Sequence, residues 1–188
     1  MRVLVACEYT ATVRDAFLER GHDAWSCDTR PTAGDPQRHY QCDVREVLSQ
    51  NWDLMIAHPP CTYLTLAGNK HYADSLLRLM AVGFVFDLWN SPIPKVCIEN
   101  PIGYLSTAWR KPDQYIQPYE YGHPFTKKTC LWLRGLPKLG PTETVQPARG
   151  SYAWNSLGIR KSDRDKTFSG WAEAMASQWS EVVVQCVM

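Results

Sequence analysis

The segment WDLMIAHPPC, residues 52–61, runs from a short apolar stretch directly into two prolines and a cysteine. Its apolar part predicts a buried strand over residues 52–57. The segment PKVCIENP, residues 94–101, is built in the same way, with a predicted strand over residues 94–98 followed by Glu-Asn-Pro. Strands that end in polar or reactive residues are typical of parallel sheets, because ligands bind beyond the carboxyl ends of such strands.

Outward from these two segments, strands alternate with helical stretches through the first hundred residues. Val13, Ala16 and Phe17 have helical spacing, and Gly21 follows where a helix C-cap belongs. This alternation predicts an α/β fold, with a mostly parallel sheet, right-handed crossovers and helices on both faces. The expected strands are 2–7, 23–27, 52–57 and 94–98, and the expected helices are 10–20, 43–49 (with Asp43 as N-cap) and 74–89.

The helix expected over residues 74–89 is amphipathic. Its predicted core face carries Leu76, Leu77, Met80, Phe84 and Leu88. The pattern weakens after Pro101, where we expect a strand over 129–133, a loop over 140–156, and a closing helix and strand over 164–184. A length of 188 residues fits one domain with a sizeable core, so we expect residues 1–188 to form a single domain.

The composition is that of an ordinary globular protein, with 45% hydrophobic and 21% charged residues. No apolar run approaches the ~18–20 residues that a membrane-spanning helix needs, and the first residues, MRVLVACEYT, resemble a strand rather than a signal peptide. Seven cysteines show neither a CxxC pair nor zinc-ligand spacing. We therefore expect reduced thiols, no metal, no membrane partner and a cytoplasmic location, the host cytoplasm if a phage encodes the chain.

Charge is distributed unevenly along the chain. Residues 1–90 contain 8 Lys/Arg and 11 Asp/Glu, whereas residues 91–188 contain 12 Lys/Arg and 8 Asp/Glu. An acidic half followed by a basic half suits a cofactor-binding half and a half that faces a polyanion. Random scatter of surface charge explains the same numbers equally well.

Two residues at the predicted strand ends are candidates for chemistry. Cys61 follows consecutive prolines, which stiffen the backbone and can hold a thiol at a fixed, open position. Most cysteines are small buried residues, and we expect that of Cys7, Cys27, Cys97 and Cys186. Glu99 emerges from a buried strand, where desolvation would raise its pKa and let it donate a proton; a loop cap or a partner of a nearby arginine is the alternative.

Together, HPPC and IENP resemble the Pro-Cys and Glu-Asn motifs of DNA cytosine-5 methyltransferases, in the same order and on the same elements. Adenine and N4-cytosine methyltransferases usually carry an aromatic residue after Pro-Pro, where this chain has Cys61. The whole chain resembles small phage-encoded enzymes of the cytosine-5 family through HPPCTYL, IENP, GHPFTKKTCLWL and AEAMASQW. The resemblance implies a Rossmann-like fold that depends on S-adenosylmethionine.

The resemblance also implies roles for individual residues. Cys61 would add to C6 of a flipped cytosine as a thiolate, which makes C5 able to attack a methyl sulfonium, and Glu99 would protonate or hydrogen-bond ring N3. Asp28 would accept from the ribose hydroxyls, and Asp43 would bind the adenine amino group. The further cofactor-binding residues that the resemblance implies are Ala6, Cys7, Glu8, Tyr9, Val44 and Pro59.

The chain departs from the family pattern in three ways. The first motif is normally rich in glycine, whereas ACEYTAT contains none, and Glu8 and Tyr9 stand at the expected glycines. The arginine that holds the flipped base is not evident, and Arg164 is the best candidate. No large target-recognition domain fits, so residues 101–166 must provide the DNA-facing region.

Residues 101–166 mix basic and aromatic side chains, which suits phosphate contact and base stacking. We expect Lys127 and Lys128 to contact DNA phosphates and Tyr63, beside the Cys61 loop, to contact DNA. The alternative is that the aromatic residues are core and the charges a solvated face. Few side chains remain to reach base edges, so we expect a short target site.

Two other functions remain open at this stage. The same chemistry could act on RNA or on a free cytosine nucleotide, because the chain has no recognition domain. The chain could also be a non-catalytic module that binds S-adenosylmethionine and regulates a partner. Retention of both Cys61 and Glu99 argues against the second alternative, since an inactive copy needs neither residue. Neither the oligomeric state nor the biological role follows from the sequence.

Overall fold

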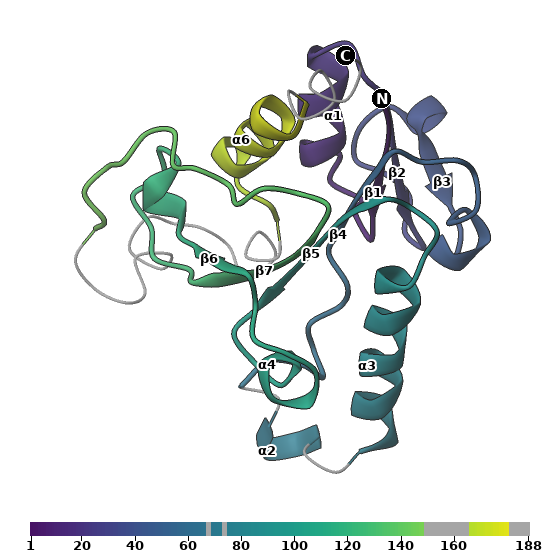
Figure 1. The fold of residues 1–188 in the computed structure, drawn as a ribbon, viewed down its shortest axis with the longest axis vertical. Helices are drawn as coiled ribbons and strands as arrows, with labels where there is room; N and C mark the ends of the chain where they lie inside the picture. The colour runs from purple at the N-terminus through teal and green to yellow at the C-terminus, as the bar shows by residue number, and fades with distance from the viewer. Residues whose placement is uncertain (67–68, 73–74, 149–165, 181–188) are drawn as a thin grey trace.

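The computed structural model describes residues 1–66, 69–72, 75–148 and 166–180. Its centre is a mixed sheet in which seven strands are described, in the order β3-β2-β1-β4-β5-β7-β6 (Figure 1). The strands are β1 (Arg2–Ala6), β2 (Asp23–Asp28), β3 (His39–Gln41), β4 (Leu54–Ala57), β5 (Lys95–Pro101), β6 (Gln114–Ile116) and β7 (Thr129–Arg134).

The predicted, mostly parallel sheet is confirmed. Neighbouring strands from β3 to β5 pair in parallel, whereas β7 runs antiparallel to both β5 and β6. The strands expected near residues 2–7, 23–27, 52–57, 94–98 and 129–133 are all present. Strands β3 and β6 were not predicted, because each is only three residues long and shows no alternation of its own.

Helices cover both faces of the sheet, as predicted, and α1 packs beside α6 while α3 lies on the opposite side (Figure 1). This arrangement is a Rossmann-like α/β fold. The α-helices are α1 (Thr12–Glu19), α2 (Asn69–Tyr72), α3 (Leu76–Trp89), α4 (Leu105–Ala108) and α6 (Ser169–Ser180). The short 3-10 helices are η1 (Pro36–Arg38), η2 (Val44–Glu46) and η3 (Pro118–Glu120).

Helix α1 ends as its sequence predicts. Gly21 has a positive φ of 77°, a conformation that glycine adopts at little cost. Its amide donates to the carbonyl of Leu18, and the amide of His22 donates to that of Phe17. These two hydrogen bonds form a Schellman motif, which turns the chain sharply into β2.

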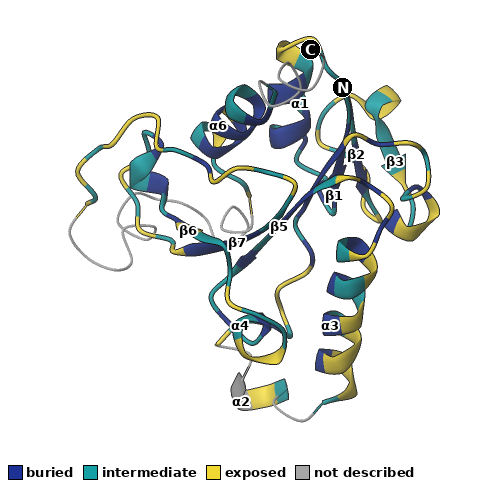
Figure 2. Ribbon diagram, in the orientation of Figure 1, coloured by how far each residue is buried: buried dark blue, intermediate teal, exposed yellow. Residues whose placement is uncertain are grey.

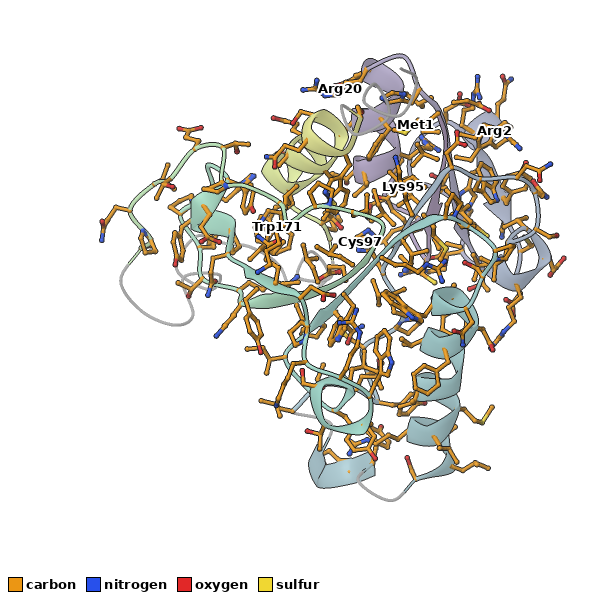
Figure 3. All side chains as sticks on the ribbon, viewed as in Figure 1. Met1, Arg2, Arg20, Lys95, Cys97 and Trp171 are labelled. Carbon is orange, nitrogen blue, oxygen red and sulfur yellow. The ribbon has the colours of Figure 1, made fainter. Side chains whose placement is uncertain are left out.

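The hydrophobic core is divided into two parts by the sheet. On one face, Trp171 and Trp179 of α6 and Phe17 of α1 pack over residues such as Cys97 of β5 (Figure 3). On the other face, α3 and η2 cover the sheet, and Trp132 of β7 is fully buried there. Alternate residues of each central strand therefore serve opposite cores, which explains their nearly continuous apolar sequence.

The predicted core face of α3 is confirmed only in part. Leu88 is buried and Phe84 packs partly buried against the core, as predicted, but Leu76, Leu77 and Met80 are exposed. The other buried residues of the helix are Arg78, Val82 and Val85. Figure 2 shows the exposed side of α3 along its length. The helix is apolar on nearly every side, so periodicity alone could not identify the face that packs.

Other expectations were confirmed only in part. Asp43 caps a helix by accepting from the amide of Arg45, but this helix, η2, is a single 3-10 turn rather than the expected 43–49. The predicted closing helix corresponds to α6, and the strand expected after it falls on 181–184, outside the described residues. In the described part of the chain, no helix is long and apolar enough to cross a membrane.

Two leucines of α3 provide a direct test of this packing. Leu88 is fully buried, whereas the side chain of Leu79 is 67% exposed. We expect Leu88→Ala to lower the free energy of unfolding by about 2–5 kcal/mol, because it leaves a cavity under the sheet. Leu79→Ala should change it by less than about 0.5 kcal/mol. Chemical denaturation of both variants checks this, and equal losses would contradict the packing described here.

Candidate active site

The turn after β1 contains no glycine, yet two of its residues adopt backbone conformations that glycine usually adopts. Cys7 has a φ of 60° and Ala11 a φ of 64°, both in the left-handed region. Residues other than glycine reach this region at a cost of roughly 1–2 kcal/mol each. The chain therefore keeps the backbone course that a glycine-rich loop would give.

Glu8 stabilises this turn from inside. Its side chain is almost fully buried and accepts hydrogen bonds from the amides of Val13 (2.7 Å) and Arg14 (3.2 Å). These amides belong to the first turn of α1, whose donors lack partners within the helix. The amide of Glu8 also donates to the carbonyl of Cys27, which joins the turn to β2.

Asp28 lies at the carboxyl end of β2, and its side chain is only 9% exposed. One carboxylate oxygen accepts from the amide of Arg30 at 2.9 Å and from its guanidinium at 3.2 Å. The same guanidinium lies 3.7 Å from the centre of the Tyr9 ring. Arg30 thus connects Asp28 with the turn after β1, a contact that no sequence pattern predicts.

The ends of β1, β2 and β3 converge on one region. Burial, followed by the negative charges of Asp28 and Asp43, raises the pKa of the Cys7 thiol to about 12. Asp43 caps η2 and forms an ion pair with Arg45 at 3.0 Å, and Val44 is buried beneath it. The predicted cofactor residues of these three strands are therefore neighbours.

The HPPC and IENP motifs are held together by the register of β4 and β5. Ala57 pairs with Ile98 in parallel, so the next two residues of each strand also face each other. His58 Nδ1 and Glu99 Oε2 are 2.9 Å apart, and Asn100 Nδ2 donates to the carbonyl of Pro59 at 2.9 Å. Each motif thereby fixes the position of the other.

The loop that carries Cys61 is also held along its length. Cys61 is exposed, and its carbonyl accepts from the amides of Leu64 and Thr65. The carbonyl of Leu64 accepts from the amide of Tyr104 at 2.7 Å, and that of Tyr63 accepts from Arg78 of α3 at 2.9 Å. Buried Arg78 thus anchors the Cys61 loop, which explains why a cation occupies the packed face of α3.

The pKa of Glu99 differs from the prediction. Burial alone would raise its pKa, but the hydrogen bond and charge of His58, and then the charge of Lys127, lower the pKa below its ordinary value. The prediction of a raised pKa is therefore wrong, since the predicted desolvation is outweighed by a cationic partner. That partner is His58 rather than the arginine considered from the sequence.

The remaining predicted residues lie as follows. Lys127 is half-buried, and its charge acts on Glu99, whereas Lys128 is exposed and its ammonium lies 4.3 Å from the centre of the Tyr115 ring. Tyr63 is half-buried, with its ring 4.8 Å from that of Tyr72. Arg164 lies outside the described residues. No group of three or more metal-binding side chains is present in the part of the chain described.

From the sequence, His58 is a possible catalytic helper to which no role is assigned, because a histidine beside proline in a loop is more often structural. The informative feature was its place immediately after one strand and opposite Glu99 after the next, which becomes visible only when β4 and β5 are paired in register.

Solved structures share this fold. They include a "putative DNA modification methyltransferase" encoded within a prophage of E. coli (TM-score 0.51, 15% identity, 78% of this chain and 52% of that chain covered). The S. pombe Dnmt2 methyltransferase (0.51, 16%, 76% and 52%) and the Entamoeba histolytica methyltransferase EhMeth (0.52, 13%, 77% and 57%) are also similar. This chain thus has the fold of methyltransferases and spans about half the length of these proteins.

Comparison with models of known protein families gives no match, and neither does comparison with curated protein sequences. The similarity to the solved structures therefore defines the fold, while the site must be argued from the chain's own residues.

Gly103 tests how the Cys61 loop is held. A Cβ atom at this position would lie 1.9 Å from the carbonyl oxygen of Leu64, so Gly103→Ala must push the loop away. We expect a loss of about 1–3 kcal/mol in the free energy of unfolding, as overpacking typically causes. Gly83→Ala is the matched control, because its Cβ would meet nothing within 4 Å and alanine favours the helix by up to about 1 kcal/mol. Equal stability of the two variants in chemical denaturation would refute the docking of this loop.

Proposed function

We propose that this protein transfers a methyl group from S-adenosylmethionine to C5 of cytosine in DNA, with Cys61 as the nucleophile. The observation that carries the proposal is the pairing of His58-Pro59 with Glu99-Asn100. It brings the loop of an exposed cysteine and a buried carboxylate to one edge of the sheet, beside the turn after β1. The fold shared with methyltransferases supports the same conclusion.

The chain's own residues suit the proposed cofactor. Asp28 offers a carboxylate at the end of β2, as a ribose diol requires, and Cys7 takes the positive φ of the turn that would lie beside the ligand. Asp43 and Val44 would border the adenine. When bound, the cofactor supplies an electrophilic methyl group. Glu8 would contribute by holding the turn in shape, since both of its oxygens already serve α1.

The reaction then needs a nucleophile and an acid on opposite parts of one base. The Cys61 thiolate would add to C6 of the cytosine, which makes C5 nucleophilic. Glu99 would hold a proton at N3, so that the ring does not accumulate negative charge. C5 would then take the methyl group. Loss of the C5 proton to a solvent base would re-form the C5–C6 double bond and expel the Cys61 thiolate. The base must leave the duplex to reach this edge of the sheet.

Charge and aromatic side chains support a nucleic-acid substrate. The ammonium of Lys128 lies over the exposed ring of Tyr115 on β6, and a cation with an aromatic ring suits a nucleic-acid backbone and its bases. The charge of Lys127 instead acts on Glu99, so we propose that Lys127 contacts the nucleotide that reacts. With so few groups for reading bases, the target site should be short.

RNA or a free cytosine nucleotide is the alternative substrate, and a non-catalytic cofactor-binding module is the alternative function. Parallel assays of methyl transfer to duplex DNA, RNA and dCMP separate them. Transfer to DNA alone supports the proposal, and transfer to RNA or dCMP alone replaces the substrate. Cofactor binding without transfer to any of the three would favour the module.

Covalent trapping tests the nucleophile. DNA that contains 5-fluorocytosine should form a stable adduct with the wild-type protein and cofactor, because fluorine prevents the final proton loss. The adduct should vanish in Cys61→Ser and persist in Cys42→Ser, a control in which a half-buried thiol is removed. Denaturing gel electrophoresis and mass spectrometry detect it. An adduct that survives in Cys61→Ser would assign the chemistry to another residue.

Calorimetry tests the cofactor site. Asp28→Ala should weaken binding of S-adenosylmethionine by roughly 1–3 kcal/mol, the usual scale for a lost hydrogen bond to a charged group. Glu19→Ala removes an exposed carboxylate from the far end of α1 and should leave the affinity unchanged. The assignment of Asp28 fails if both variants bind as tightly as the wild type.

A further inference from the structure

The contact between His58 and Glu99 is a buried hydrogen bond between two titratable side chains. The two side chains are only 11% and 15% exposed, and the 2.9 Å distance fits a hydrogen bond from His58 Nδ1 to the carboxylate. The other ring nitrogen, Nε2, is buried and has no hydrogen-bond partner among the described residues. Among the described residues, the ring therefore hydrogen-bonds only to Glu99.

From this geometry we propose that the acid acting on the cytosine is the His58–Glu99 pair, in which His58 stores the proton that Glu99 delivers. His58 is thus a positioning and proton-storing residue that acts through Glu99. This inference rests on the proposed function, because it assigns a source to the proton that cytosine N3 receives there.

The proton balance requires no further reactant. In the resting protein, His58 is an imidazolium and Glu99 a carboxylate. The Nδ1 proton moves to Glu99 Oε2, which leaves a neutral imidazole that keeps its Nε2 proton and a neutral carboxylic acid. Glu99 then passes one proton to N3 as Cys61 adds to C6, and it becomes a carboxylate again. When the product forms, N3 returns the proton to the pair.

The charged groups around the ring come from three other elements. Glu99 of β5 and Glu8 of the turn after β1 favour the imidazolium, whereas Lys127, before β7, opposes it. Burial also opposes the charge, but the hydrogen bond and charge of Glu99 and the charge of Glu8 outweigh it, so the pKa of His58 lies above its ordinary value. Glu99 has a lowered pKa for the reciprocal reason.

The signs of these shifts define a pH window. A raised histidine pKa stabilises the fold fully below 6.5, and this contribution is lost as the pH rises through the folded value. A lowered carboxylate pKa stabilises it above 4.5, and this contribution is lost as the pH falls. Both side chains are therefore charged between pH 4.5 and pH 6.5. As the pH rises above the pKa of His58, the imidazolium loses the proton that it would supply to Glu99.

A merely structural role would not require a titrating group. Asn100 already joins the two strand ends through Pro59, and the backbone amide of His58 donates to the carbonyl of Ala6 at 2.9 Å. An asparagine at position 58 could place its amide nitrogen near the position of Nδ1 and keep a donor to Glu99. His58→Asn therefore keeps the hydrogen bond to Glu99 and removes the side chain that can store a proton.

The first measurement is independent of activity. The pKa of the His58 ring is followed by NMR in the wild type and in Glu99→Gln, with His22, at the amino end of β2, as an internal reference. We expect the pKa of His58 to fall in Glu99→Gln and that of His22 to stay unchanged. An unchanged His58 pKa would overturn the proposal, whatever the protein methylates.

The second measurement is the pH dependence of single-turnover methyl transfer. In His58→Asn, we expect the rate at neutral pH to fall roughly 10–100-fold, and the loss of activity at high pH to shift to lower pH, because Glu99 must then hold the proton itself. The affinity for S-adenosylmethionine should change less than twofold, and His22→Asn should match the wild type.

A His58→Asn variant with the wild-type rate and pH profile would reduce His58 to a structural residue. If the wild type transfers no methyl group to DNA, RNA or dCMP, the proposed function fails, and with it the catalytic role of the pair. The NMR result would still show whether Glu99 raises the pKa of His58, so the two failures are distinguishable.

Discussion

The register between β4 and β5 is the constraint on which the site depends. Because Ala57 pairs with Ile98, His58 must face Glu99 and Pro59 must face Asn100. A one-residue slip would exchange the two cores of the sheet and separate these pairs, so apolar burial on both faces enforces the register. The packing of the hydrophobic core thereby determines that the Cys61 loop lies beside the buried carboxylate of Glu99.

The turn after β1 shows how a sequence without glycine can retain a demanding backbone. Cys7 and Ala11 adopt positive φ values, and Glu8 compensates by binding the open amides of α1. Small side chains at both strained positions limit steric conflict. The same turn leads into the His58–Glu99 region, since the carbonyl of Ala6 accepts from the amide of His58. The proposed cofactor edge and the proposed reactive edge are thus one continuous backbone network.

Much of this arrangement could be predicted because strand periodicity and strand-end residues are local signals. The apolar runs gave the central strands, and Cys61, Glu99 and Asp28 were recognised at their ends. The burial of Arg78 depends on the carbonyl of Tyr63, and the partner of Glu99 depends on strand pairing, so neither has a local signature. The face of α3 was mispredicted in part for a related reason: leucines on all sides of a helix do not indicate which side meets the sheet.

Cytosine-5 transfer differs from other methyl transfers to DNA bases in the atom that receives the methyl group. Duplex DNA incubated with the protein and S-adenosylmethionine carrying a deuterated methyl group can be digested to nucleosides and analysed by mass spectrometry. We expect deuterated 5-methylcytosine in the wild-type reaction and none with Cys61→Ser. Label in N4-methylcytosine or N6-methyladenine would contradict this expectation, because neither product requires a cysteine that adds to the ring.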